Sequence, residues 1–338
     1  MSLARAEARR LAKRRVTRYT LLLMVLGLAA IAVSFALTSQ KIGPEQLAAA
    51  RAEATRGEDL ARQQADAERA DCERVKESGG GGDRFPPGFD CAQITGPPPG
   101  TYQAEWYLPY QFDFRKEFSI FIAVFCGILA LFAFIVGASF VGAEWSSGGM
   151  MNLLLWRPKR LGVLFTKLGV LLGAVLGIGL ALGVVWTVAF WLIGRYSGRL
   201  GELTPGAWQS FALDGARGLG LVLAVAAVSF GLASIGRHTA LALGAAVAVG
   251  VASEIGIRIA MSVAGVSFGD RFVLSTYAVS WFMKRYELID WSSCDFVQGA
   301  CEPDKLLVTW QDSALVFGVG TALVLVVAAW MMRSRDIT

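Results

Sequence analysis

Long apolar runs alternate with charged segments along the chain and predict six membrane-spanning helices. A helix needs about 20 residues to cross the hydrocarbon core of a bilayer. Six runs approach or exceed this length: residues 19–37, 118–141, 162–193, 211–235, 239–263 and 313–332. Only helices and closed barrels satisfy their backbone polar groups in lipid, and these runs are far longer than barrel strands. We therefore expect an all-α polytopic membrane protein.

The first run has an alternative interpretation as a secretory signal peptide, because basic residues precede Tyr19. The apolar region of a signal peptide has about 7–15 residues, whereas this run has 19. An uncleaved signal anchor is therefore the favoured interpretation. A shorter run, residues 272–283, has 12 residues and cannot span. It predicts a re-entrant or interfacial helix before the last span.

The composition excludes an ordinary soluble enzyme, because 54% of the 338 residues are apolar and only 17% are charged, against about 25% in soluble domains. The net charge of +5 is unevenly distributed. With the N-terminus inside, the cytoplasmic segments sum to +11 and the outer loops to −6. Positive residues gather on the cytoplasmic side of membrane proteins. We therefore expect both termini to be cytoplasmic.

The same orientation assigns the remaining segments. Residues 1–18 become a basic amphipathic helix on the inner side, and residues 142–161 a second cytoplasmic segment. The outer side then receives a large first loop, residues 38–117, and residues 264–312, which contain the short apolar run. The stretch from Pro44 to about Glu77 is rich in helix-forming residues and predicts an extracytoplasmic helix or helical hairpin.

Four of the five cysteines fall in the predicted outer loops: Cys72, Cys91, Cys294 and Cys301. An even number of cysteines in an oxidising compartment indicates disulfide bonds. Pairing within each loop is the simplest arrangement, although four cysteines allow three connectivities. Neither spacing has the C-x-x-C form of a metal site, and four free thiols are the remaining alternative.

Two features inside the spans predict helix contacts. Gly169, Gly173 and Gly177 form a doubled GxxxG pattern, which allows close helix packing within the chain or between two copies. Glu254 and Arg258 are four residues apart and can form an intramembrane ion pair. Such a pair serves a structural role or a functional one, and the sequence favours neither.

Motifs for catalysis are absent from the chain. It contains neither the G-x-x-x-x-G-K-[ST] phosphate loop nor H-E-x-x-H nor G-x-S-x-G, and it has one histidine. We therefore expect no catalytic activity, no cofactor and no metal site in this chain, and no nucleic acid as a partner. Any energy-driven function would need another subunit.

The segment between the second and third spans carries the functional prediction. It contains Glu144, Gly148, Leu155, Pro158 and Arg160, and Lys167 follows at the start of the next span. Met150 and Leu154 add apolar contact surface. In order and spacing this segment resembles the permease subunits of type-2 ABC exporters, with a departure at Gly149, where that family often has Thr. The six spans and inner termini extend the resemblance, whereas the large first loop lies outside the family pattern.

The resemblance implies a coupling helix that docks on a separate ATPase subunit, with Glu144, Gly148, Met150, Leu154, Pro158 and Arg160 as the coupling residues. Two permeases, identical or paralogous, and two ATPases would form the working unit, and ATP-Mg would bind the partner. The expected location is the inner or plasma membrane of a bacterium. Two alternatives remain: a sensor or assembly protein that binds a partner through its outer loop, and an ion-driven transporter that uses Glu254 and Arg258.

Overall fold

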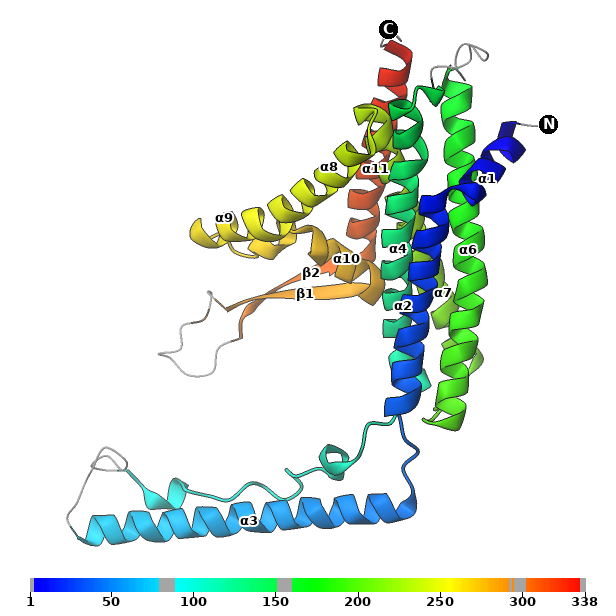
Figure 1. Ribbon diagram of the computed structural model, residues 1–338. Coiled ribbons are helices and arrows are strands. Elements are labelled where there is room, and N and C mark those ends of the chain that lie inside the picture. The colour runs from blue at the N-terminus through cyan, green and yellow to red at the C-terminus, as the bar shows by residue number, and fades with distance from the viewer. Residues whose placement is uncertain (1–2, 79–88, 151–159, 292–293, 295–301, 335–338) are drawn as a thin grey trace. The chain divides into compact units, whose positions relative to one another are not determined.

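The computed structural model describes residues 3–78, 89–150, 160–291, 294 and 302–334, and the chain divides into two compact units (Figure 1). The first unit contains residues 1–33, 114–191 and 201–338, and the second contains residues 34–113 and 192–200. Six helices in the described part are long and apolar enough to cross a membrane, as the apolar runs predict. The chain is thus a helical protein of the multi-pass membrane type.

A short amphipathic helix, α1 (Leu3–Lys13), precedes the candidate spans. The spans are α2 (Arg15–Thr38), α4 (Phe114–Ser146), α6 (Arg160–Tyr196), α7 (Pro205–Gly236), a helix over Thr239–Val263, and α11 (Trp310–Ser334). The helix over Thr239–Val263 has the bounds that the sequence predicted, and it consists of α8 (Thr239–Val251), the π-helical turn η3 (Ala252–Ile257) and α9 (Arg258–Val263). The sequence did not predict the π-helical turn within it.

Helices α4 and α7 pack together at the centre of the first unit. Small residues permit the contact: a Cβ atom added at Gly137 of α4 would collide with the Ser229 hydroxyl of α7, and one at Gly218 with the Cys126 thiol. Aromatic contacts extend the core to α6, where the tilted rings of Phe121 and Phe190 have centroids 4.3 Å apart. Outward-facing apolar side chains on the other spans suit a lipid environment.

The segment before the last span contains two kinds of secondary structure. The short apolar run forms α10 (Leu274–Met283), preceded by the 3₁₀ turn η4 (Gly269–Phe272). Strands β1 (Arg285–Asp290) and β2 (Asp304–Thr309) then pair as an antiparallel hairpin, with Arg285 opposite Thr309. The sequence did not predict these strands, because each has only six residues and one side of the pleat is not consistently apolar.

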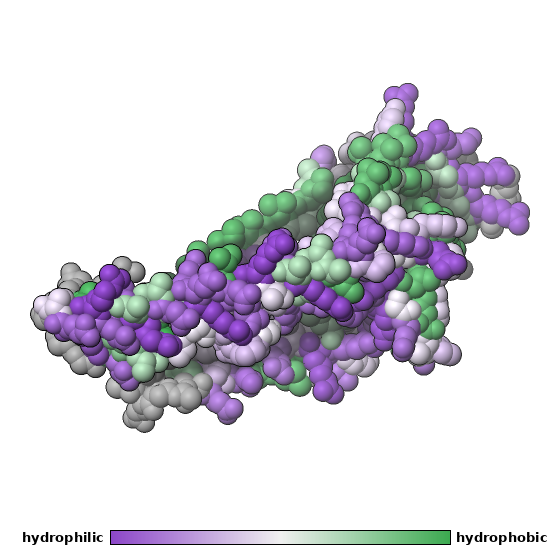
Figure 2. Space-filling view, turned by 90° about the horizontal axis from the view of Figure 1, so that it is seen from below, coloured by the Kyte–Doolittle hydropathy of each residue, from purple (hydrophilic) through white to green (hydrophobic). Residues whose placement is uncertain are grey.

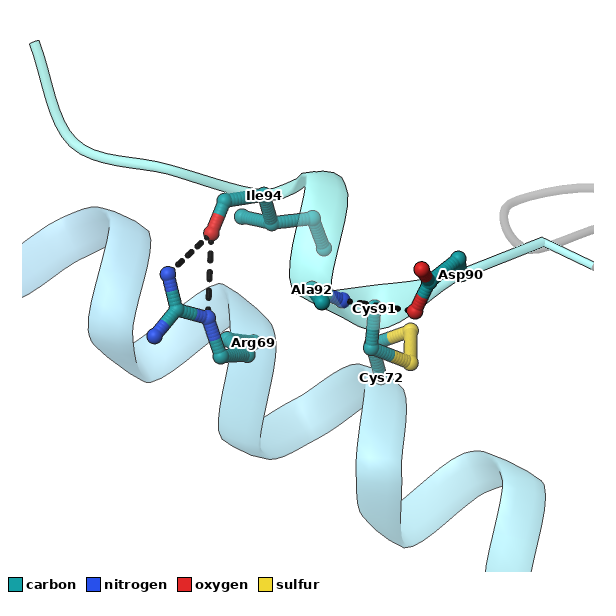
Figure 3. The surroundings of a disulfide bond; sticks show 6 residues. All are labelled: Arg69, Cys72, Asp90, Cys91, Ala92 and Ile94. Atoms are coloured by element: carbon teal, nitrogen blue, oxygen red, sulfur yellow. Dashed lines mark hydrogen bonds between the residues drawn. A yellow bond between two sulfur atoms is a disulfide. The ribbon is translucent and has the colours of Figure 1, made fainter.

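The second unit is a long helix with an extended segment bonded along it. Helix α3 (Pro44–Glu77) begins with Pro at its first turn, where the missing N–H costs nothing. The chain then returns along this helix: Cys91 is disulfide-bonded to Cys72, and the carbonyl oxygen of Ile94 accepts two hydrogen bonds from Arg69 (Figure 3). Farther along, the N–H of Gly100 donates to Glu58. The long polar helix is thus stabilised by its own return segment.

Aromatic residues near the end of the return segment also pack on α3. The turn η2 (Ala104–Tyr107) packs on α3, and a Cβ atom added at Gly57 would lie 2.7 Å from the Tyr107 hydroxyl. The face of α3 seen in Figure 2 is mostly hydrophilic, in agreement with its many exposed Glu, Asp and Arg side chains.

The remaining cysteines differ in state. Cys294 is disulfide-bonded, and Cys301 lies outside the described residues. Cys126 of α4 is a buried free thiol.

Candidate functional site

The end of α4 and the start of α6 carry two residues of the predicted coupling motif, Glu144 and Lys167, and the fold joins them. The Nζ atom of Lys167 lies 2.6 Å from Oε2 of Glu144. Residues 147–160, the central part of the predicted coupling segment 142–161, lie between them in the sequence. The ion pair therefore joins the two helices from which this segment leaves and to which it returns.

The N-terminal helix contributes two further charges. The same Lys167 ammonium donates a 2.5 Å hydrogen bond to Oε2 of Glu7 on α1. Arg14, at the junction between α1 and α2, donates to Oε1 of Glu144 (2.8 Å) and to the carbonyl oxygen of Ser139 (2.7 Å). We call Glu7, Arg14, Glu144 and Lys167 the ionic joint. It links α1, α4 and α6 at one point.

The ionic joint is buried and electrically balanced. The side chains of Lys167 and Glu7 are 0% and 1% exposed, and that of Glu144 is 10% exposed. The ring of Phe140 lies beneath both cations, 5.0 Å from Nζ of Lys167 and 5.2 Å from Cζ of Arg14. Buried charges are tolerated when paired and are strongly destabilising when one partner is lost. The joint therefore favours one fixed arrangement of its helices.

The pattern of α1 explains how Glu7 reaches the joint. Glu7 and Leu11 are four residues apart and are the buried residues of this helix, while basic side chains cover its other faces. Arg10 reaches Glu7 from the exposed side at 3.3 Å. The sequence prediction did not include Glu7 or Arg14 in the site. One signal was present: Glu7 is the single acidic residue before Tyr19.

The structure places the predicted coupling residues in different environments. Glu144 is largely buried against its own chain, and its carboxylate is paired with Arg14 and Lys167. Gly148 has φ +72°, a left-handed conformation that favours glycine, and Met150 is fully buried. Arg160 begins α6, whereas Leu154 and Pro158 lie outside the described residues.

The turn between α7 and α8 packs beside the joint on the end of α4. A Cβ atom added at Gly142 would lie 2.5 Å from both the backbone nitrogen and the hydroxyl of Thr239, so only glycine fits there. The guanidinium carbon of Arg237 lies 4.9 Å from the centre of the Trp145 ring. A displacement of the end of α4 would therefore disturb its contacts with α7 and α8 as well as those with α1 and α6.

Glu254 and Arg258 form the pair that their spacing predicts, at 3.8 Å, but both also have other partners. Oε1 of Glu254 accepts the backbone N–H of Ser275, and Oγ of Ser253 accepts that of Leu274. These two groups cap the N-terminus of α10, where a carboxylate is favourable to the helix dipole. Arg258 also contacts Asp270 at 3.1 Å. The arrangement connects the π-helical turn to α10.

A second charged group lies near the other end of α4 and α7. Asp214 is buried, accepts a hydrogen bond from the Ser119 hydroxyl (3.1 Å), and lies 3.3 Å from Arg217 and 3.6 Å from Lys284. The indole N–H of Trp281 donates to the carbonyl oxygen of Arg217. This group attaches α10 to the central pair of helices, which is a structural role.

The predicted packing stripe on α6 has no covering helix from the described chain. Gly169, Gly173 and Gly177 are all exposed, and a Cβ atom added at any of them would meet no described atom within 4 Å. The sequence predicted that this stripe packs either within the chain or between two copies. The described residues of the chain do not pack against it.

The described residues hold no group of three or more His, Cys, Asp or Glu side chains placed to bind a metal. Comparison of the chain with protein-family models, with curated proteins and with solved structures gave no match.

Proposed function

We propose that this chain is the membrane-spanning permease subunit of an ABC exporter, coupled to a separate ATPase subunit through residues 147–160. One observation carries the proposal: Glu144 and Lys167, which the resemblance selects from opposite sides of this segment, meet in a buried ion pair. Ordinary cytoplasmic loops need no such charge pair at their base. The six apolar helices supply the membrane portion that this function requires.

In this proposal the ionic joint transmits motion rather than contacting the ATPase. ATP binding would close the ATPase dimer and displace residues 147–160. Because Lys167 bonds both Glu7 and Glu144, displacement of the segment moves the ends of α1, α4 and α6 together. A ligand shifts such an equilibrium only by its differential affinity for two conformations. The ATPase must therefore bind one arrangement of these helices more tightly than the other.

The test is co-purification and ATPase stimulation with a candidate ATPase subunit. Arg160→Glu reverses a charge at the start of α6 and should weaken assembly. Glu144→Gln removes one charge of the joint and should reduce stimulation more than assembly. Glu202→Gln is the matched control, because Glu202 is exposed in the segment that links α6 to α7, at the opposite ends of those helices from the joint. Unchanged assembly and stimulation in both test variants would refute the proposal.

A second candidate function is recognition of an envelope partner by the second unit. The observation that favours it is the 34-residue, disulfide-linked helix α3. Its polar surface is much larger than that of a short loop that only connects two spans. Removal of residues 44–107 distinguishes the two functions. The permease function predicts that the shortened chain still assembles with the ATPase and stimulates it. The recognition function predicts that neither the full nor the shortened chain assembles with an ATPase, and that the shortened chain loses its envelope partner.

A further inference from the structure

A cavity of about 640 Å³ lies between α4, α6 and α7, away from the ionic joint. Its walls are almost entirely carbon. The larger lining side chains are Phe118, Phe125, Trp186, Trp208, Phe211 and Leu219. The volume falls within the range of about 300–1,000 Å³ found for small-molecule sites.

Glycines create this space. Gly179 and Gly183 of α6 and Gly215 of α7 all line the cavity. A Cβ atom at Gly183 would meet only the Phe125 ring, at 3.7 Å, and one at Gly215 would meet nothing within 4 Å. A larger side chain at either position would therefore project into free volume. The cavity is thus present because these positions are occupied by glycine and not by residues with larger side chains.

Two polar side chains of the wall, Trp186 and Thr187, donate their hydrogen bonds within the protein. The indole N–H of Trp186 donates to the carbonyl oxygen of Phe121 (3.1 Å), and the Thr187 hydroxyl donates to that of Gly183 (2.8 Å). A water molecule needs two to four polar partners to remain in a cavity, and apolar cavities stay dry or hold apolar ligands. The chemistry of the wall therefore selects a hydrocarbon.

The cavity opens toward the outside of the helix bundle. Leu180, Val184 and Val188 line it and are also 54%, 64% and 50% exposed. All three lie within a helix long and apolar enough to cross a membrane. At this depth the surrounding medium is the acyl region of the bilayer, so the opening faces hydrocarbon chains.

A cation lies one helical turn beyond the wall. Arg115, Phe118, Ile122 and Phe125 follow the helical spacing of one face of α4, and the last three line the cavity. The Arg115 side chain is exposed, with its guanidinium carbon 6.0 Å from the centre of the Phe211 ring. Trp208 also lines the cavity, and its ring centroid lies 6.0 Å from that of Phe114, the residue before Arg115. Tryptophan is a residue type enriched at membrane interfaces.

We propose that the cavity holds one acyl chain of a bilayer phospholipid, whose phosphate binds Arg115. The apolar wall, the opening to lipid and the cation in line with the wall together define a tail site and a headgroup site. Arginine suits this role because its planar guanidinium binds phosphate oxygens in pairs. The site is separate from the ionic joint and stands whether or not the chain couples to an ATPase.

The first test uses the full-length protein without mutation. A phosphatidylglycerol with a photoactivatable group in its acyl chain is added to the protein in mild detergent, and labelled peptides are identified by mass spectrometry. Labelling concentrated on residues 118–126 and 179–188 is expected. Labelling confined to α2 or α11, with none on these residues, overturns the proposal.

The second test counts bound phosphatidylglycerol by native mass spectrometry. Gly183→Leu and Gly215→Leu fill the cavity and should each lower retention by at least tenfold. Gly127→Leu is the matched control, because Gly127 is exposed on α4 with no described atom within 4 Å of an added Cβ. Two independent filling variants keep the test decisive if one of them fails to fold.

The headgroup arm compares Arg115→Gln with Arg195→Gln, an exposed arginine at the end of α6. The first change should weaken phosphatidylglycerol binding about tenfold, as expected for loss of a charge-assisted hydrogen bond, and the second should leave it unchanged. Equal lipid retention in all variants overturns the proposal. So does loss of a dimer, rather than of lipid, in Gly183→Leu, because a second copy would then cover the opening.

Discussion

Replacement of Lys167 by Met tests whether the ionic joint holds the first unit together. Lys167 forms ion pairs with both carboxylates, with its Nζ 2.5 Å from Oε2 of Glu7 and 2.6 Å from Oε2 of Glu144. Its removal leaves Glu144 paired with Arg14 at 2.8 Å. Among the described residues, Glu7 then keeps its ion pair with Arg10, whose side chain is 57% exposed. The change therefore strands one buried carboxylate, not two.

The expected loss of stability is that of one unpaired buried carboxylate. Loss of one partner of a buried ion pair destabilises a protein by about 3–5 kcal/mol. Arg10→Gln is the matched control, because it removes a cation from the same carboxylate on its exposed side, where ion pairs contribute about 0–1 kcal/mol. The free energy of unfolding can be measured by titrating sodium dodecyl sulfate into dodecyl maltoside micelles, with tryptophan fluorescence and circular dichroism as readouts.

A double variant separates charge from packing. Glu7→Gln combined with Lys167→Met removes the stranded carboxylate and leaves the Glu144–Arg14 pair intact. The effects of substitutions at interacting sites are not additive. The double variant no longer contains the unpaired Glu7 carboxylate, so its free energy of unfolding should exceed that of Lys167→Met alone by about 1 kcal/mol or more. The reasoning is wrong if Lys167→Met unfolds at the same detergent fraction as Arg10→Gln, or if adding Glu7→Gln destabilises it further.

Three further changes test other parts of the structure. Gly148→Ala forces a side chain into a φ of +72° and should cost about 1 kcal/mol in the same unfolding assay, whereas Gly149→Ala, with normal φ, should cost less. Replacing Cys72 and Cys91 by Ala removes the cross-link between residues that are 19 apart in the sequence, and it should destabilise the second unit by about 3 kcal/mol. We expect a protease to cleave residues 89–113 faster in this variant, and an unchanged cleavage rate would contradict the prediction. Glu254→Gln weakens the cap of α10, so the amide of Ser275 should exchange hydrogen faster while amides of α7 keep their rates.

The sequence predicted the spans well because each one is specified locally. An apolar run of about 20 residues has few alternatives in a membrane, and all six such runs are helical. The spacing of Glu254 and Arg258 likewise predicted their ion pair, because helical geometry alone places residues i and i+4 together. Its role as a cap for α10 depends on a contact 21 residues away and could not be read from that spacing.

The ionic joint was only half predictable for the same reason. Motif spacing singled out Glu144 and Lys167, but Glu7 is 160 residues from Lys167 in the chain. No periodicity relates an N-terminal helix to the third span. The π-helical turn in the fifth span was equally hidden, because its Gly and Ser neighbours are compatible with a regular helix in lipid. Tertiary packing decided both features.

The energetics of the joint determine how the first unit can respond to force. Pulling Glu144 away from Lys167 exposes or strands a buried charge, at a cost of about 3–5 kcal/mol. Sliding α1, α4 and α6 together keeps every ion pair of the joint intact, and the packing of α4 on α7 transmits the movement to that helix. Opposite this group, Gly142 holds the α7–α8 turn against α4 too closely for any side chain. The lower-energy response to a push on residues 147–160 is therefore movement of these helix ends as one body, which is the property a coupling element requires.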